Sequence, residues 1–142
     1  QPSRYLQAPY TIGGINVFAA DSDAEAERLS TTLIRMFLGI FTGRRECLQP
    51  PVDLTPDLRD IAANPAIHQM LKYTFAGSKE TVRRKTEEFL QQTRVDELMV
   101  VSSIYDHRDR LRSYEIFSDV MHEIADASPA STSAPFYPPT VV

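Results

Sequence analysis

This sequence contains a single cysteine, Cys47, among its 142 residues. One cysteine cannot form an intrachain disulfide, and Cys47 has no neighbours at a metal-ligand spacing. No base partner for its thiol is recognisable in the sequence, which argues against a cysteine nucleophile. His, Asp and Glu likewise form no metal spacing that we recognise, so we expect no metal ion.

The sequence also lacks long apolar runs, a secretory leader pattern and an excess of positive charge. Without a run of about 20 apolar residues, it offers no segment to span a membrane. Its formal net charge is −4, which gives no electrostatic reason to bind nucleic acid or an anionic membrane. Its five glycines form neither a dinucleotide fingerprint nor a P-loop. We therefore expect a cytoplasmic protein that binds neither nucleic acid nor membrane.

Three apolar stretches, each followed by a helical pattern, dominate what is present. They are residues 11–20, 73–77 and 97–103, and a continuous apolar run is typical of a strand buried on both faces of a parallel sheet. Three strands that each lead into a helix predict an α/β fold with a parallel sheet. The expected helices lie between Ser22 and Gly43, at 57–71 with a break near Asn64, at 79–93 and at about 109–127.

Two local patterns add detail to these helices. Ser22 and Glu25 match a capping box, in which the hydroxyl accepts from the Glu25 amide and the carboxylate reaches back. Apolar residues at steps of three and four predict the buried stripes. These residues are Ala26, Leu29, Leu33, Met36, Phe37 and Ile40 in the first helix, and Leu111, Tyr114, Phe117, Met121 and Ile124 in the last.

Several segments in this order and spacing resemble one enzyme family, the bacterial luciferase-like, flavin-dependent monooxygenases. The resemblance is to the carboxy-terminal part of these enzymes and covers nearly all of residues 1–125. Lys79 departs from the pattern, because the family commonly has proline there, at the start of a helix. The segments that carry the resemblance are Pro9-Tyr10, 14–26, 77–82, 96–100, 104–107 and 110–115.

The family folds as a (β/α)₈ barrel of about 250 residues or more. The resemblance therefore implies that residues 1–127 form the carboxy-terminal half of such a barrel, with its last three strands and a helical insert. Residues 128–142 are Pro/Ser-rich, and we expect a flexible tail there. The expected partner is an amino-terminal barrel half or another copy of this chain, because three strands leave two sheet edges open.

The active site of such a barrel lies at the carboxyl ends of its strands. Gly77 permits close approach of a ligand, and the amides after Ser78 could hold an anion such as a flavin phosphate. The alternative is that Ser78 only caps the helix that follows it. The resemblance favours this alternative, because most flavin-phosphate contacts in the family come from earlier strands.

Polar residues after the last strand are further candidates. Ser102, Ser103 and Tyr105 stand where the family would place a flavin ring or substrate, although polar residues are also ordinary in loops. His107, with Tyr105, is a candidate catalytic residue, since a histidine near arginines could serve the flavin or an anionic substrate. The alternative is that Asp106 caps the last helix and the arginines form surface ion pairs.

Two kinds of function follow. In the first, the chain is part of an oxidoreductase that uses reduced FMN, or else a deazaflavin, to monooxygenate a small organic substrate. In the second, it is a non-catalytic half-barrel that completes a barrel with itself or a partner chain. Another explanation is that residues 1–142 are a truncated or proteolytic remnant of a longer chain, because such a remnant would have the same sequence as a natural half-barrel.

Overall fold

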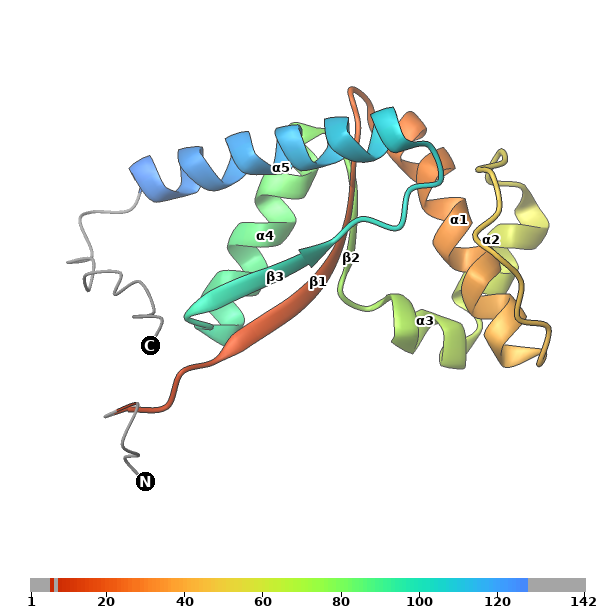
Figure 1. Cartoon of the computed structure of the whole chain (residues 1–142), viewed down its shortest axis with the longest axis horizontal. Helices are drawn as coiled ribbons and strands as arrows, with labels where there is room; N and C mark the ends of the chain where they lie inside the picture. Colours follow the sequence, from red (N-terminus) through yellow and green to blue (C-terminus); the bar gives the residue numbers. More distant parts are fainter. Residues whose placement is uncertain (1–5, 7, 128–142) are drawn as a thin grey trace, which may run out of the picture.

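A computed structural model describes residue 6 and residues 8–127, and it confirms an α/β fold with parallel strands. The tail predicted at 128–142 lies outside the described residues. No helix in the described part of the chain is long and apolar enough to cross a membrane. The elements are β1 (Ile12–Ala19), α1 (Asp23–Phe41), α2 (Pro56–Ala63), α3 (Pro65–Leu71), β2 (Thr74–Gly77), α4 (Lys79–Thr93), β3 (Glu97–Val101) and α5 (His107–Ala127) (Figure 1).

The three strands form one parallel sheet in the order β2-β1-β3. The carboxyl half of β1 pairs with β2, with Asn16 opposite Thr74, and its amino half pairs with β3, with Ile12 opposite Glu97. Three consecutive strands of a barrel would lie in chain order, with β2 in the middle. Here α4 carries the chain from the β2 edge to the opposite edge, so β1 is central.

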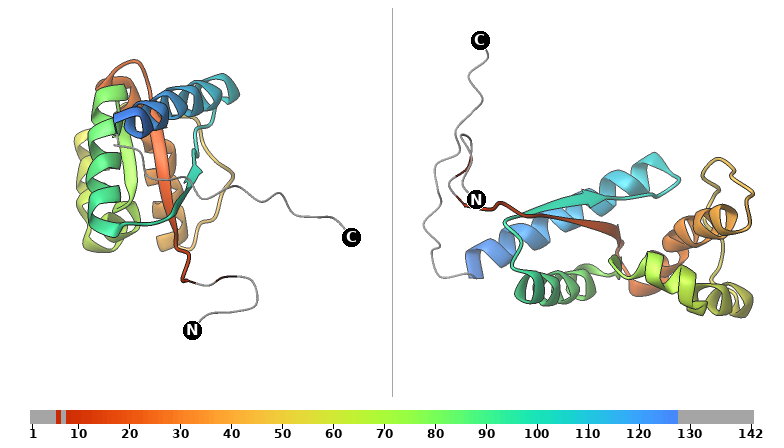
Figure 2. Two further views of the ribbon diagram at one scale, coloured as in Figure 1. Left: turned by 90° about the vertical axis from the view of Figure 1, so that its left-hand side faces the viewer. Right: turned by 90° about the horizontal axis from the view of Figure 1, so that it is seen from below.

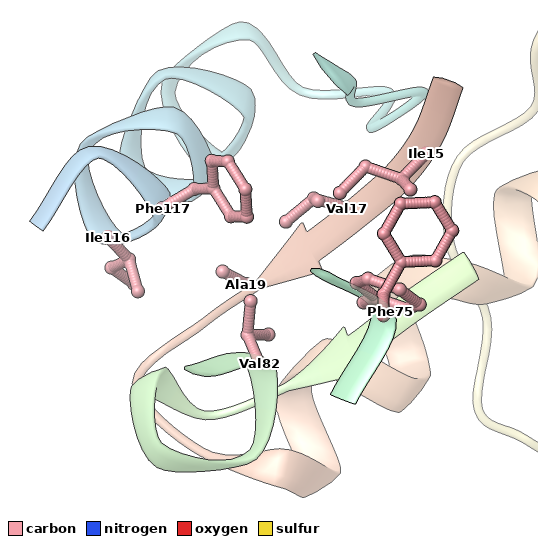
Figure 3. Packing of buried hydrophobic residues seen from close by; sticks show 8 residues of the cluster. Ile15, Val17, Ala19, Phe75, Val82, Ile116 and Phe117 are labelled. Carbon is pink, nitrogen blue, oxygen red and sulfur yellow. The ribbon is translucent and has the colours of Figure 1, made fainter. Parts of the chain in front are cut away.

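The main hydrophobic core lies on one face of this sheet. Ile15 and Val17 of β1 and Phe75 of β2 point into it, and Val82 of α4 and Phe117 of α5 close it (Figure 3). α4 and α5 contact each other as well as β1, and they lie on the same side of the sheet (Figure 2). Burial of these apolar side chains is the main source of stability for this layer.

The buried stripe of α5 differs from the prediction. Leu111 and Tyr114 are exposed, so the predicted stripe was wrong there, while Phe117 is buried as predicted. The sequence of this helix offers two apolar stripes, and packing against β1 selects the one that contains a buried serine. The buried residues of α5 are Ser113, Ile116, Phe117 and Val120.

The second face of the sheet is only half covered. α1 packs over its carboxyl end, where Phe18, Leu33 and Ile104 are fully buried. At the amino end, Ile12 and Met99 are 53% and 59% exposed. The prediction that residues 11–20 and 97–103 are buried on both faces was therefore wrong at this end, because no helix of the described residues covers it.

Val101 shares this uncovered surface and is 47% exposed. Ile12, Met99 and Val101 project from the same side of the sheet, because Gly14 pairs with Met99 and Asn16 with Val101 in the parallel register. We call Ile12, Met99 and Val101 the open face. Figure 1 shows β1 and β3 side by side, with α4 behind them.

The predicted helix boundaries are largely confirmed. Ser22 accepts a hydrogen bond from the Glu25 amide at 3.2 Å, but the Glu25 carboxylate binds Arg28 instead of reaching back. α1 ends just before Gly43, whose φ is 74°, in the left-handed region that favours glycine. Asn64 separates α2 from α3, as the sequence predicts.

Candidate functional site

The carboxyl ends of the three strands lie at one edge of the sheet and are joined by polar side chains from the helices. Ser113 of α5 is fully buried, and its hydroxyl accepts a 2.9 Å hydrogen bond from the Ala19 amide at the end of β1. The Ser102 hydroxyl, just after β3, lies 3.4 Å from that of Ser113. Thr32 of α1 donates to the carbonyl of Ser103 at 2.8 Å. These bonds fix the strand ends relative to the helices.

The ends of β1 and β2 are joined through Asp23. This residue begins α1, and its Oδ1 accepts a 2.7 Å hydrogen bond from the backbone amide of Ser78, which precedes α4. Hydrogen bonds from the Ser78 amide and from Thr81 lower the pKa of the Asp23 carboxyl. A negative charge of the chain itself therefore lies at the start of α4, where the helix dipole favours an anion.

This contact changes the interpretation of Gly77 and Ser78 as a phosphate cradle. The Ser78 amide is already bound by a carboxylate, and a Cβ on Gly77 would lie 2.8 Å from Asp23 Oδ1. Ser78 is the N-cap residue of α4, as the alternative held, but its side chain makes no capping hydrogen bond. Its hydroxyl lies instead 3.5 Å from that of Thr81.

The serines after β3 are also engaged within the chain. Ser102 is 5% exposed, its amide donates to the Tyr114 hydroxyl at 3.0 Å, and its own hydroxyl contacts Ser113. Ser103 is partly exposed, and its carbonyl accepts from Thr32. Each of the four candidate flavin ligands therefore has a hydrogen-bond partner within the chain, because the Gly77 carbonyl also accepts from the Ala20 amide. Their role in binding flavin stays a prediction.

Tyr105 and His107 remain accessible at this edge. Tyr105 is half exposed, and His107 begins α5 on the surface. Arg110 Nη2 lies 2.9 Å from His107 Nδ1. Because a guanidinium only donates hydrogen bonds, Nδ1 accepts and the ring proton of neutral His107 is on Nε2. The Nε2–H group of His107 is therefore a hydrogen-bond donor at this edge.

The ordinary structural roles proposed for the neighbouring residues are also observed. Asp106 Oδ1 accepts from the amides of Arg108 and Asp109 at 2.8 and 3.3 Å and so caps α5. Arg112 forms an exposed ion pair of 2.9 Å with Asp21, which joins α5 to the loop after β1. Exposed pairs of this kind add little stability.

Lys85 lies at the outer edge of β2. Its Nζ donates to the carbonyl of Ala76 at 2.9 Å. Burial lowers the pKa of the Lys85 ammonium group, with repulsion from Arg84 as the second cause. A lysine that binds an edge carbonyl hinders the approach of a further strand.

Sequence reasoning missed the roles of Asp23, Ser113 and Lys85. Ser113 had a signal, because it lies three and four residues before the buried Ile116 and Phe117. A serine on a buried stripe indicates a buried hydrogen bond. Asp23 is already explained in the sequence by its place in the first turn of α1, where acidic residues are favourable. No local pattern in the sequence indicates that it lies beside Ser78.

The described residues hold no group of three or more His, Cys, Asp or Glu placed to bind a metal ion.

A surface hollow of about 470 Å³ lies beside the second half of α1, with Arg35, Arg44 and Cys47 among its lining residues. A second hollow, of about 380 Å³, lies along β2 and includes Tyr73 and Phe89. Neither is lined by the residues predicted to bind flavin.

The chain is similar to parts of several longer proteins, although no family model matches it. It is 38% identical over 124 residues to the uncharacterized protein YddN of Bacillus subtilis, covering 87% of this chain and 37% of YddN. It is 34% identical over 124 residues to the luciferase-like monooxygenase of Escherichia coli K12, again covering 87% of this chain and 37% of that protein. The chain thus spans little more than a third of the curated relatives it matches.

A solved structure also matches this chain over most of its length. The crystal structure of apo-MsnO8 matches with a TM-score of 0.64 and 27% identity, covering 81% of this chain and 35% of that one. Over most of its length, the chain is therefore a homologue of one part of proteins that include luciferase-like monooxygenases.

Proposed function

We propose that this chain is one part of a luciferase-like, flavin-dependent monooxygenase that acts on a small organic substrate. The observation that carries the proposal is the 34% identity to the luciferase-like monooxygenase of Escherichia coli over 124 residues. Enzymes of this family are flavin-dependent, so we propose reduced FMN as the cofactor, with a deazaflavin as the alternative. When bound, the flavin supplies the activation of oxygen.

In this proposal the chain contributes part of the barrel wall and part of its mouth, with its three strands in chain order in the full-length enzyme instead of the order β2-β1-β3 of this chain alone. The remainder of the barrel supplies the contacts to the flavin phosphate, because the amide of Ser78 is bound by Asp23. Tyr105 and the Nε2–H group of His107 are the groups of this chain that we propose face the substrate. The uncovered side chains of the open face support the proposal, since a barrel interior is filled by inward-pointing side chains of this kind.

The test is FMN binding by a full-length chimera. In this chimera the present chain replaces the matched region of the Escherichia coli luciferase-like monooxygenase, and FMN binding is followed by fluorescence quenching. We expect one FMN per chimera and none bound by the 142-residue chain alone. A folded chimera that binds no FMN, beside an Escherichia coli parent that does, would sink the proposal.

A second candidate function is a non-catalytic module that associates with a second copy of itself. The open face favours it, because exposed apolar side chains on adjoining strands mark interaction surfaces. A solution mass of two chains, reduced to one by Met99→Lys but not by Leu111→Lys, would support this candidate. Leu111 is the matched control because it is an exposed apolar residue on α5.

A further inference from the structure

We infer that the hollow beside the second half of α1 is a binding site for a small organic anion, a monocarboxylate with a short apolar tail. The hollow has a volume of about 470 Å³, which is within the range of small-molecule sites. None of its lining residues belongs to the strand ends of the candidate flavin site. The inference therefore goes beyond the proposed function and does not depend on flavin binding.

One wall of the hollow is α1, and the other is the segment that follows it. We call residues 44–52 the strap, because they run back beside α1 (Figure 1). Arg35 Nη1 donates to the Pro50 carbonyl at 2.9 Å. The Thr31 hydroxyl accepts from the Val52 amide at 3.0 Å. The far end of the strap is thus held against the helix by two hydrogen bonds.

The near end of the strap depends on two glycines. Gly43 turns the chain back with a φ of 74°, in the left-handed region that favours glycine. A Cβ on Gly39 would lie 2.5 Å from the Arg44 carbonyl oxygen, so a larger residue there would push the strap away from α1. Both ends of the strap are therefore fixed, and the chain itself builds the hollow.

The charges of the hollow favour an anion. Arg35 and Arg44 contribute two guanidinium groups, and Glu46 is the one carboxylate among the described residues that line it. Neither arginine forms an ion pair within the described part of the chain. A guanidinium presents its N–H donors in a fork that matches the two oxygens of a carboxylate. The excess of one positive charge suits a monoanion better than a phosphate dianion.

Apolar side chains in the lining favour an organic anion over a simple ion. Met36 and Leu38 line the hollow together with the arginines and are only partly buried. Ligand sites commonly combine such apolar walls with a few polar groups that fix the orientation of the ligand. A hydrocarbon tail would remove both side chains from water. The lining thus predicts a carboxylate with a short tail, for which hexanoate is a probe.

Cys47 provides a reporter inside the hollow. It is one of the lining residues and the only cysteine of the sequence. Iodoacetate and iodoacetamide differ in charge but little in size, and both alkylate the thiolate. The ratio of their rates therefore does not depend on the thiol pKa or on its exposure. In the 142-residue chain we expect Arg44→Gln to lower the ratio of iodoacetate to iodoacetamide rates by at least about threefold.

Arg45→Gln is the matched control. Arg45 is also exposed and is closer to Cys47 in the sequence than Arg44, but it does not line the hollow. The rate ratio should therefore change less in Arg45→Gln than in Arg44→Gln. An equal or larger change in Arg45→Gln would overturn the inference, because the charge would then act through proximity along the chain.

Salt gives a second measurement that needs no variant. The ratio of iodoacetate to iodoacetamide rates in the wild type should fall as ionic strength rises, because salt screens the attraction between exposed charges. A ratio that stays constant or rises with salt would contradict an anion site around Cys47.

Protection of Cys47 identifies the class of ligand. Hexanoate at about 10 mM should slow alkylation by iodoacetamide at least about threefold, which corresponds to a Kd of about 5 mM or lower. This protection should persist in Arg45→Gln and weaken in Arg44→Gln. Neither hexanamide nor inorganic phosphate at matched ionic strength should protect as well. Absence of protection by hexanoate, or equal protection by hexanamide or by phosphate, would overturn the inference.

Discussion

The carboxylate of Asp23 accepts a 2.7 Å hydrogen bond from the backbone amide of Ser78 and so joins the first turn of α1 to the start of α4. The two residues are 55 positions apart in the sequence, and each follows the carboxyl end of a different strand. An anion-binding position at a helix start is therefore filled by the chain's own carboxylate.

Replacing Asp23 with asparagine should change how stability depends on pH. The folded-state pKa of Asp23 is lowered, first by the Ser78 amide and then by Thr81. The carboxylate therefore contributes stability above its unfolded pKa, which is about 3.9, and this contribution is lost as pH falls through the lowered folded pKa. Thermal unfolding should show Asp23→Asn below the wild type in melting temperature near neutral pH.

The difference in melting temperature should shrink as the pH falls below about 4. Asp60→Asn is the control, because Asp60 is an exposed carboxylate on α2. A difference between Asp23→Asn and the wild type that stays constant from neutral pH to pH 2.5 would show that the charge of Asp23 plays no part.

Gly77→Ala should destabilise the fold by about 1–3 kcal/mol. Gly77 has a φ of 156°, and an added Cβ would meet the Thr81 side chain and lie 2.8 Å from Asp23 Oδ1. Thr81→Ser removes the nearest methyl group and should restore part of the loss. Urea unfolding measures both variants.

Gly14→Ala is the control for Gly77→Ala. Nothing lies within 4 Å of a Cβ at Gly14, so this variant should differ from the wild type by no more than about 0.5 kcal/mol. Equal losses for the two alanine variants would contradict the close contact between Gly77 and Asp23.

Ser113→Ala should cost about 1–3 kcal/mol in the free energy of unfolding. The change removes the hydroxyl that accepts from the buried Ala19 amide at 2.9 Å and leaves that amide without its partner. Ser30→Ala is the matched control, because the Ser30 hydroxyl only bonds the Glu27 carbonyl on the surface of its own helix. A Ser113→Ala variant as stable as Ser30→Ala would mean that water replaces the hydroxyl.

Lys85→Met should alter both self-association and the pH dependence of stability. Burial lowers the folded-state pKa of Lys85, so the folded chain releases its proton first and stability rises with pH between the lowered pKa and the unfolded value of about 10.4. In Lys85→Met, the free energy of unfolding should therefore rise less with pH than in the wild type. Urea midpoints from pH 7 to pH 10 measure this difference.

The same variant exposes the edge carbonyl of Ala76, which Lys85 binds at 2.9 Å. Light scattering should therefore report more self-association in Lys85→Met than in Lys72→Met, a variant of an exposed lysine next to the same strand. Equal scattering by the two variants would mean that Lys85 does not protect the β2 edge.

Local elements could be predicted from the sequence because their signals are local. The bounds of α4, the break at Asn64 and the cap at Ser22 follow from periodicity, proline and hydroxyl chemistry within a few residues. The strand order could not be predicted in this way. It depends on which strand pairs with β1, and β1 lies some 55 residues or more from both partners.

The candidate site likewise has one part that could be predicted from local sequence and one part that could not. Tyr105 and His107 could be identified as accessible groups because they follow a strand end. The engagement of Ser78 by Asp23 and of Ser102 by Ser113 and Tyr114 depends on contacts between separate elements. Residue types and spacing do not report such contacts, so serines that suited a ligand proved to bind neighbouring parts of the chain.

The most direct test of the central claim is to compare FMN binding by the full-length chimera with binding by its Met99→Lys variant. Met99 is 59% exposed in this chain, so the 142-residue chain should tolerate lysine there, whereas a completed barrel should not. We predict one FMN bound per chimera, with loss of binding in Met99→Lys and retention in Leu111→Lys. A folded chimera that binds no FMN, or that binds it equally well with lysine at position 99, would contradict this account.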